Sequence, residues 1–73
     1  MGKLKVFSGI EVCNVLSKNG FILKRQKGSH IIMQKSSEDS TITVPVPNHK
    51  EIRIGTLKSI IRQSRIPVSE FEN

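Results

Sequence analysis

Residues 25–30, RQKGSH, place two cations, a glycine, a hydroxyl and a histidine in consecutive order. His30 can accept or donate a proton near neutral pH, because the ordinary pKa of histidine is about 6.5. Cations and backbone N–H groups beside it can stabilise a phosphate. The residues available for that task are Lys24, Arg25, Lys27, Gly28 and Ser29. The segment fits either a phosphate-handling site with a proton carrier or a polar hairpin turn.

Cleavage of RNA is a reaction that such a segment can support. RNA carries its own nucleophile, so the protein must take the 2′-OH proton, protonate the leaving 5′-oxygen and stabilise the charge on phosphorus. His30 can fill one of the two proton roles. His49, in PNHKE, is the other histidine and a possible second proton carrier. The alternative for His49 is a loop residue that forms a local hydrogen bond.

The chain lacks the sets of residues that other catalytic mechanisms require. The adjacent acids Glu38 and Asp39 are too few for a two-metal nuclease, and two histidines and one cysteine, widely spaced, do not make a zinc site. The chain has no P-loop or dinucleotide-binding fingerprint. We therefore expect no metal and no cofactor. Cys13 is interpreted as a small core residue.

The charge balance predicts an anionic partner. Twelve Lys and Arg against six Asp and Glu give a net charge of +6, and no acid occurs between Glu11 and Glu38. A cationic surface of this kind is typical of nucleic-acid binding. The single cysteine fits a reducing cytoplasm, and no stretch reaches the length of a membrane span. Met1-Gly2 is not read as a myristoylation signal, because that motif requires Ser or Thr where this chain has Val6.

The first element that positions these residues is a predicted helix over residues 8–20. Ser8 and Glu11 form an S-x-x-E capping box, and Asn19-Gly20 supplies the C-terminal stop. Apolar residues at helical spacing predict a buried stripe. That stripe comprises Ile10, Val12, Cys13, Val15 and Leu16.

Three strands are expected next, over residues 21–26, 30–35 and 41–46. Phe21 and Leu23 are predicted to share one face of the first strand. Gly28 can adopt positive φ in the turn before His30. Pro45 should end the hydrogen-bonding of the third strand or place it at a sheet edge.

A second helix is predicted from Thr56, as its cap, to about Arg65. Leu57, Ile60 and Ile61 form its packing face. Cations occupy the opposite side, at Lys58, Arg62 and Arg65. These three can bind RNA, contact an acidic protein or face water. After Pro67 the chain has room for a short turn anchored by Phe71.

The expected fold is α+β, in the order α-β-β-β-α, as a single domain over residues 1–73. A three-stranded antiparallel sheet carries two helices on one face, as in a double-stranded-RNA-binding domain. Fold alone does not establish function.

Three blocks in this order resemble the HicA family of toxins, also called YcfA-like, from toxin–antitoxin pairs. They are NGFILKRQKGSH, TVPVPNHKEI and GTLKSIIRQSRIPVSEF. The resemblance implies a metal-independent endoribonuclease, an mRNA interferase, that is inhibited by a HicB-type antitoxin. It also implies that His30 is catalytic. Two residues depart from the family pattern: Ile31 stands where many members have a second histidine, and Arg65 replaces a helix-ending glycine.

A non-catalytic RNA-binding module of similar fold is the alternative function. The helix start GTLKSI lacks the dense lysine cluster with which typical double-strand binders span the groove. Base stacking on aromatic residues is also disfavoured, because the chain has no Trp or Tyr and its three Phe are expected in the core.

Overall fold

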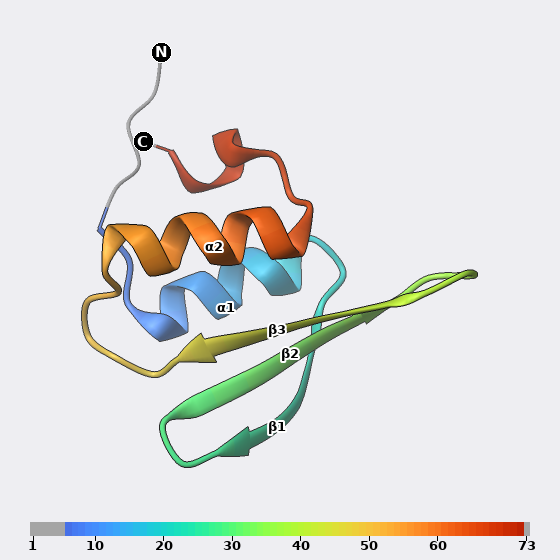
Figure 1. Ribbon diagram of the computed structural model, residues 1–73, viewed down its shortest axis with the longest axis horizontal. Coiled ribbons are helices and arrows are strands. Elements are labelled where there is room, and N and C mark those ends of the chain that lie inside the picture. The colour runs from blue at the N-terminus through green and yellow to red at the C-terminus, as the bar shows by residue number, and fades with distance from the viewer. Residues whose placement is uncertain (1–5, 73) are drawn as a thin grey trace.

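The computed structural model describes residues 6–72. The interpretation of Met1-Gly2 concerns residues that lie outside this range. The elements follow the predicted α-β-β-β-α order (Figure 1). They are α1 (Gly9–Lys18), β1 (Ile22–Lys27), β2 (His30–Ser36), β3 (Thr41–Pro47), α2 (Ile54–Ser64) and the 3₁₀ turn η1 (Val68–Phe71). Within the described range, neither helix is long and apolar enough to cross a membrane.

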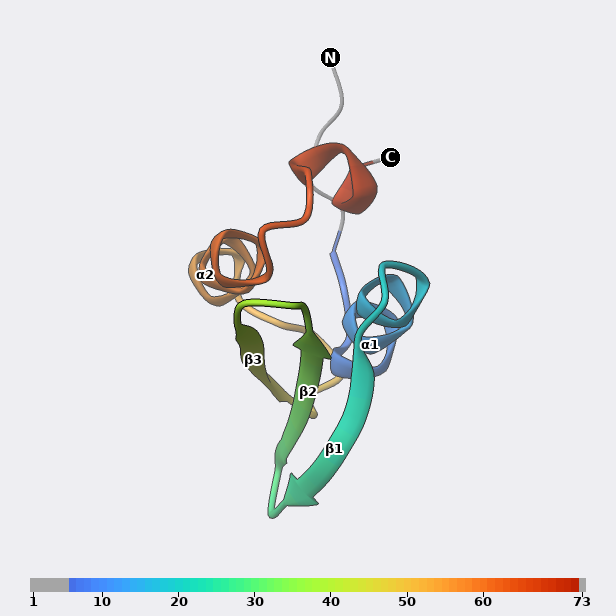
Figure 2. The same ribbon diagram turned by 90° about the vertical axis from the view of Figure 1, so that its right-hand side faces the viewer.

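The three strands form one antiparallel sheet in the order β1-β2-β3, and both helices cover the same face of it (Figure 2). Alternation along the strands decides which side chains face the helices. Ile31 and Met33 of β2, with Val44 and Val46 of β3, are buried on that inner face. His30 therefore lies on the outer face of the sheet, one position away from the core.

The core joins both helices, the sheet and the C-terminal turn. All three phenylalanines are buried in it, as expected from the sequence. Phe7 and Phe71 meet edge to face, with ring centroids 5.7 Å apart, so η1 is anchored against the segment that enters α1. The predicted role of Phe71 is confirmed.

The start and stop of α1 are those that its sequence predicts. The Glu11 backbone N–H donates to Ser8 Oγ at 3.1 Å, and the Ser8 N–H donates to Glu11 Oε1 at 2.9 Å. Asn19 caps the C-terminal end, and Gly20 follows with φ of 94°.

The buried stripe of α1 differs from the prediction at one residue. Ile10 is 55 % exposed, whereas Val12 and Leu16 are fully buried. The stripe runs through Gly9, Val12 and Leu16, at i, i+3 and i+7. Ile10 is two residues, or about 200° of helix rotation, from Val12 and so points away from the sheet.

The face assignment of β1 is also wrong. Phe21 is buried but precedes the strand, whereas Leu23 is 59 % exposed. Every side chain of β1 is exposed, because this edge strand lies at the margin of the surface that the helices cover. The pairing register also shifts between Leu23 and Arg25, which marks a β-bulge at Lys24.

The opposite edge strand, β3, contains Pro45, as the sequence predicted for an edge. It pairs with β2 alone, so the missing N–H groups of Pro45 and Pro47 interrupt no inner ladder.

Helix α2 begins earlier than predicted. Its first residue is Ile54, after Arg53 with extended backbone, and the Leu57 N–H donates to the Arg53 carbonyl at 2.9 Å. Thr56 therefore lies inside the first turn and does not cap the helix. Leu57 and Ile60 pack into the core as expected.

Candidate nucleic-acid interface

A two-residue turn, Gly28-Ser29, joins β1 to β2 and places His30 at the start of β2. Gly28 has φ of 58°, whereas Ser29 does not have positive φ, which is the pattern of a type II′ hairpin turn. Such turns match the twist of the flanking strands and require glycine at the first position. The glycine of the RQKGSH segment therefore fixes the position of the histidine.

The register of the sheet brings the predicted cations onto the face that carries His30. Lys27 pairs with His30, which pairs in turn with Pro47 of β3. In the next row on this face, Arg25 pairs with Ile32. Because paired residues share a face, Arg25, Lys27 and His30 all lie on the outer face.

These side chains surround an open concavity of about 840 Å³, here named the cationic hollow. Its lining comprises Arg25, Gln26, Lys27, Gly28, Ser29, His30, Ile32, Thr43 and Pro45. Five of the six residues singled out around the hairpin are thus brought together. Lys24 is not among them, because it stands at the bulge, where it has no partner across the ladder. Among residues 6–72, no acidic residue lines this hollow.

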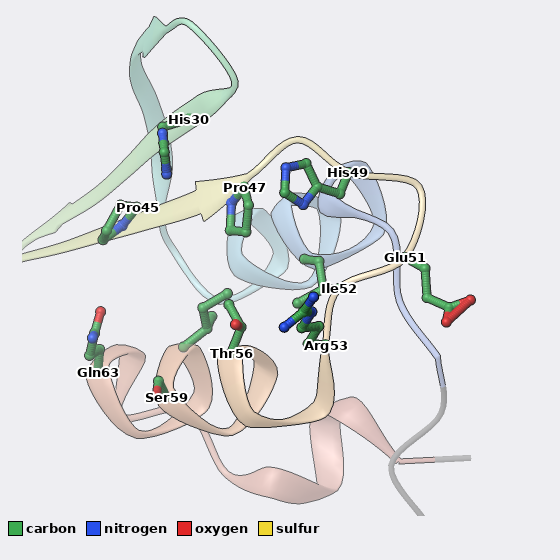
Figure 3. Close-up of a pocket in the computed structure, with 11 residues that line it drawn as sticks. His30, Pro45, Pro47, His49, Glu51, Ile52, Arg53, Thr56, Ser59 and Gln63 are labelled. Carbon is green, nitrogen blue, oxygen red and sulfur yellow. The ribbon is translucent and has the colours of Figure 1, made fainter.

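A second concavity of about 570 Å³ lies between β3 and α2 and is named here the β3–α2 cleft (Figure 3). It is lined by His30, Pro45, Pro47, His49, Glu51, Ile52, Arg53, Thr56, Ser59, Ile60 and Gln63. Arg53 and Glu51 give it one cation and one acid. His30 and Pro45 line both concavities, so the imidazole stands at their common rim.

His49 lines the same cleft as His30, and its backbone is held on both sides. The His49 carbonyl accepts a hydrogen bond from the Gly9 N–H at 2.8 Å, and the His49 N–H donates to the Pro47 carbonyl at 2.9 Å. The loop passes so close to α1 that a Cβ on Gly9 would overlap the Pro47 carbonyl oxygen. Glycine at the start of α1 is therefore a condition of this loop geometry.

One further backbone hydrogen bond ties the hairpin tip to this loop. The Asn48 N–H donates to the Ser29 carbonyl at 2.6 Å. The two histidines thus stand on segments that are fastened together next to His30. Both imidazoles belong to exposed residues, and no hydrogen bond within residues 6–72 engages either ring.

The basic stripe of α2 belongs to a different surface. Lys58, Arg62 and Arg65 are exposed, and none of them lines the hollow or the cleft. The α2 residues that do line the cleft are Thr56, Ser59, Ile60 and Gln63. Sequence reasoning missed this polar stripe, although its i, i+3, i+7 spacing between the apolar and basic faces was a visible signal.

Cys13 does not contribute to either concavity. It is partly buried beside the core, and desolvation raises the pKa of its thiol, which disfavours the reactive thiolate. Among residues 6–72, no three His, Cys, Asp or Glu residues are grouped in a way that could hold a metal ion.

The fold and the site together define a small α+β protein whose histidine stands beside a cationic concavity on an open antiparallel sheet. Residues 9–66 match the family model described as the HicA toxin of bacterial toxin–antitoxin systems. Because the match covers most of the chain, the protein belongs to the HicA toxin family. Membership gives it the role of a toxin and implies an antitoxin partner. A comparison with curated proteins finds no match.

Proposed function

We propose that this toxin is a metal-independent endoribonuclease that cleaves messenger RNA, with His30 as general acid or base. The observation that carries the proposal is the place of His30: exposed, with no hydrogen bond to its ring in the described range, and on the rim of a concavity that holds Arg25 and Lys27. Toxin-family membership supports the same reading. The likeness of the fold to RNA-binding domains is an analogy and adds little.

The reaction needs only groups that surround His30 and the RNA itself. A general base removes the proton of a ribose 2′-OH, and the 2′-oxygen forms a bond to the adjacent phosphorus. The bond from phosphorus to the 5′-oxygen breaks, and a general acid protonates that oxygen. The products are a 2′,3′-cyclic phosphate and a 5′-hydroxyl. Arg25, Lys27 and the turn N–H groups stabilise the negative charge on the phosphorane.

His49 is the candidate for the second proton role. It lines the β3–α2 cleft together with His30, on a loop whose backbone is fixed by Gly9 and Pro47. With both histidines active, the pH dependence of cleavage is bell-shaped, since one ring must be neutral and the other charged. His49→Gln should remove one limb of the bell. A bell that persists in this variant assigns His49 a structural role.

Cleavage of single-stranded RNA in EDTA, by the wild-type protein and by His30→Ala, tests the proposal. We expect the wild type to cut with EDTA present and the variant to lose about 10²- to 10⁴-fold in rate, the usual contribution of a general acid or base. Affinity for a 2′-O-methyl RNA, which has no nucleophile, should be retained. Equal cutting by both proteins contradicts the mechanism, and binding without cutting by either supports a non-catalytic RNA-binding module.

The antitoxin partner is proposed to be a HicB-type protein that covers His30 and the cationic hollow in the cytoplasm. With a net charge of +6 on the toxin, the association rate should fall markedly as salt is added. The basic stripe of α2 offers a second surface for an acidic partner. Stopped-flow measurement of the rate over a range of ionic strengths tests this, and a rate that is indifferent to salt contradicts it.

A further inference from the structure

The geometry points to the β3–α2 cleft as a binding site for one unpaired RNA base, adenine. This base would lie beside the phosphate at which His30 acts as general acid or base. This inference rests on the proposed function and deepens it, because it assigns sequence preference to named residues. Its starting point is that His30 and Pro45 line both concavities. An RNA strand whose phosphates lie in the cationic hollow therefore passes directly over the mouth of the cleft.

The two concavities differ in the chemistry they offer to RNA. The cationic hollow presents Arg25 and Lys27 with no acid, which suits phosphate. Besides His30 and His49, the cleft offers one acid, Glu51, against one cation, Arg53, together with apolar and uncharged polar side chains. A partly apolar space in which an acid offsets a cation suits a base better than a second phosphate.

The walls of the cleft match the two surfaces of a base. Pro45 and Pro47 lie on β3, across from α2 (Figure 3), and the almost fully buried Ile52 and Ile60 add a little apolar surface. These side chains can pack against the faces of a base. The phenylalanines cannot do so, because all three are buried in the core. The volume of about 570 Å³ falls in the range of roughly 300–1,000 Å³ typical of small-molecule sites.

Three uncharged polar side chains of the cleft come from one side of α2. Thr56, Ser59 and Gln63 point from the helix toward β3 (Figure 3). No hydrogen bond within residues 6–72 occupies the Gln63 carboxamide, while Ser59 Oγ accepts only a long bond of 3.4 Å from Arg62 Nη2. A glutamine carboxamide forms a bidentate pair with N6 and N7 of adenine. Among the uncharged side chains on this wall, Gln63 is the one that carries such a paired donor and acceptor.

The cleft is also built to keep its shape. Both proline rings have fixed φ, and the two residues alternate with the buried Val44 and Val46. On the other wall, Leu57 and Ile60 hold α2 against the sheet. A base can thus enter without rearrangement of either wall, which keeps the cost of binding low.

Binding of short 2′-O-methyl oligonucleotides in EDTA tests the inference without relying on cleavage. A single adenine in an oligo-uridine should raise affinity about tenfold, within the range expected for one bidentate pair. Gln63→Leu should reduce this gain to within about twofold and leave the affinity for oligo-uridine unchanged. Gln34→Leu is the matched control, because its carboxamide lies on the sheet, bonded to Thr43 Oγ1 at 3.2 Å, and lines neither concavity. It should keep the full adenine gain.

An adenine gain that survives Gln63→Leu, or equal binding of all oligonucleotides by the wild type, overturns the assignment. So does a Gln63→Leu protein that loses antitoxin binding but keeps the adenine gain, since the cleft then serves the protein partner. Because none of these oligonucleotides can be cleaved, failure of the His30 mechanism leaves the measurement intact. The two proposals can therefore fail separately.

Discussion

The cationic hollow and the β3–α2 cleft share His30 but are built in opposite ways. The hollow comes mainly from one continuous hairpin, residues 25–32, and Thr43 and Pro45 are its remote members in the described part of the chain. The cleft is assembled from the start of β2, the end of β3, the following loop and one side of α2. Local turn chemistry suffices for the first, whereas the second depends on how distant segments pack. Damage to packing should therefore harm the cleft before the hollow.

The largest effect is expected from Gly9→Ala, which acts on the packing beneath the cleft. A Cβ at this position would overlap the Pro47 carbonyl oxygen and lie 2.9 Å from Asn48 Cα. Both are backbone atoms and cannot rotate away, so the loop that carries His49 must shift. We expect a loss of about 2–3 kcal/mol in unfolding free energy, as for other overpacked sites, measured by urea denaturation.

Gly55→Ala is the matched control for that substitution. Gly55 lies in α2, and an added Cβ meets nothing within 4 Å. Alanine there should stabilise the helix by about 1 kcal/mol at most. If the two variants have equal stability, the close approach of α1 to the loop does not support the cleft, and the cleft depends on distant packing no more than the hollow does.

A smaller effect is expected from neutralising the hollow. Arg25→Gln with Lys27→Gln should remove two of the proposed phosphate contacts for every RNA sequence, so affinity should fall about tenfold without a change in base preference. The slope of log affinity against log salt should become shallower by about 1.4, or about 0.7 per contact on a single strand. Fluorescence anisotropy at several salt concentrations measures both quantities.

Lys58→Gln with Arg62→Gln removes the same charge from the basic stripe of α2, which lines neither concavity. This double variant should keep the wild-type slope to within about 0.3. If both double variants lose RNA affinity equally, then net charge, and not the placement of cations around His30, sets that affinity.

The same contrast explains how much of the molecule could be predicted from its sequence. The element order, the capping box of Ser8 and Glu11, and the Gly28 turn follow from local patterns, and the structure confirms them. Ile10 was misplaced because helical spacing alone did not fix which side of α1 faces the sheet. Thr56 is predicted as a cap because threonine is a favourable residue type at that position. The helix instead begins after Arg53, whose extended backbone makes it the cap although its side chain forms no capping hydrogen bond.

The candidate site divides along the same line. Five of six hairpin residues could be grouped in advance, since adjacent residues on a tight hairpin must stay together. The exception is Lys24, whose position depends on a β-bulge that the residue types in this segment do not predict. The cleft could not be predicted from the sequence, because Pro45 and Gln63 line the same space only through the packing of α2 beside β3.

The smallest effect is expected at the far end of α2, from Arg65→Gly. Arg65 caps the helix in the left-handed conformation, with φ of 61°, which glycine adopts without the steric cost that a Cβ imposes. The variant should gain about 1 kcal/mol and melt roughly 4–8 °C higher. Arg65→Gln, which loses the charge but keeps the Cβ, should show no such rise. Because Arg65 touches neither concavity, RNA affinity and base preference should stay at wild-type values in both variants. A loss of RNA affinity shared by both would instead place the basic stripe in the path of the RNA, and the hollow would then be only part of the phosphate-binding surface.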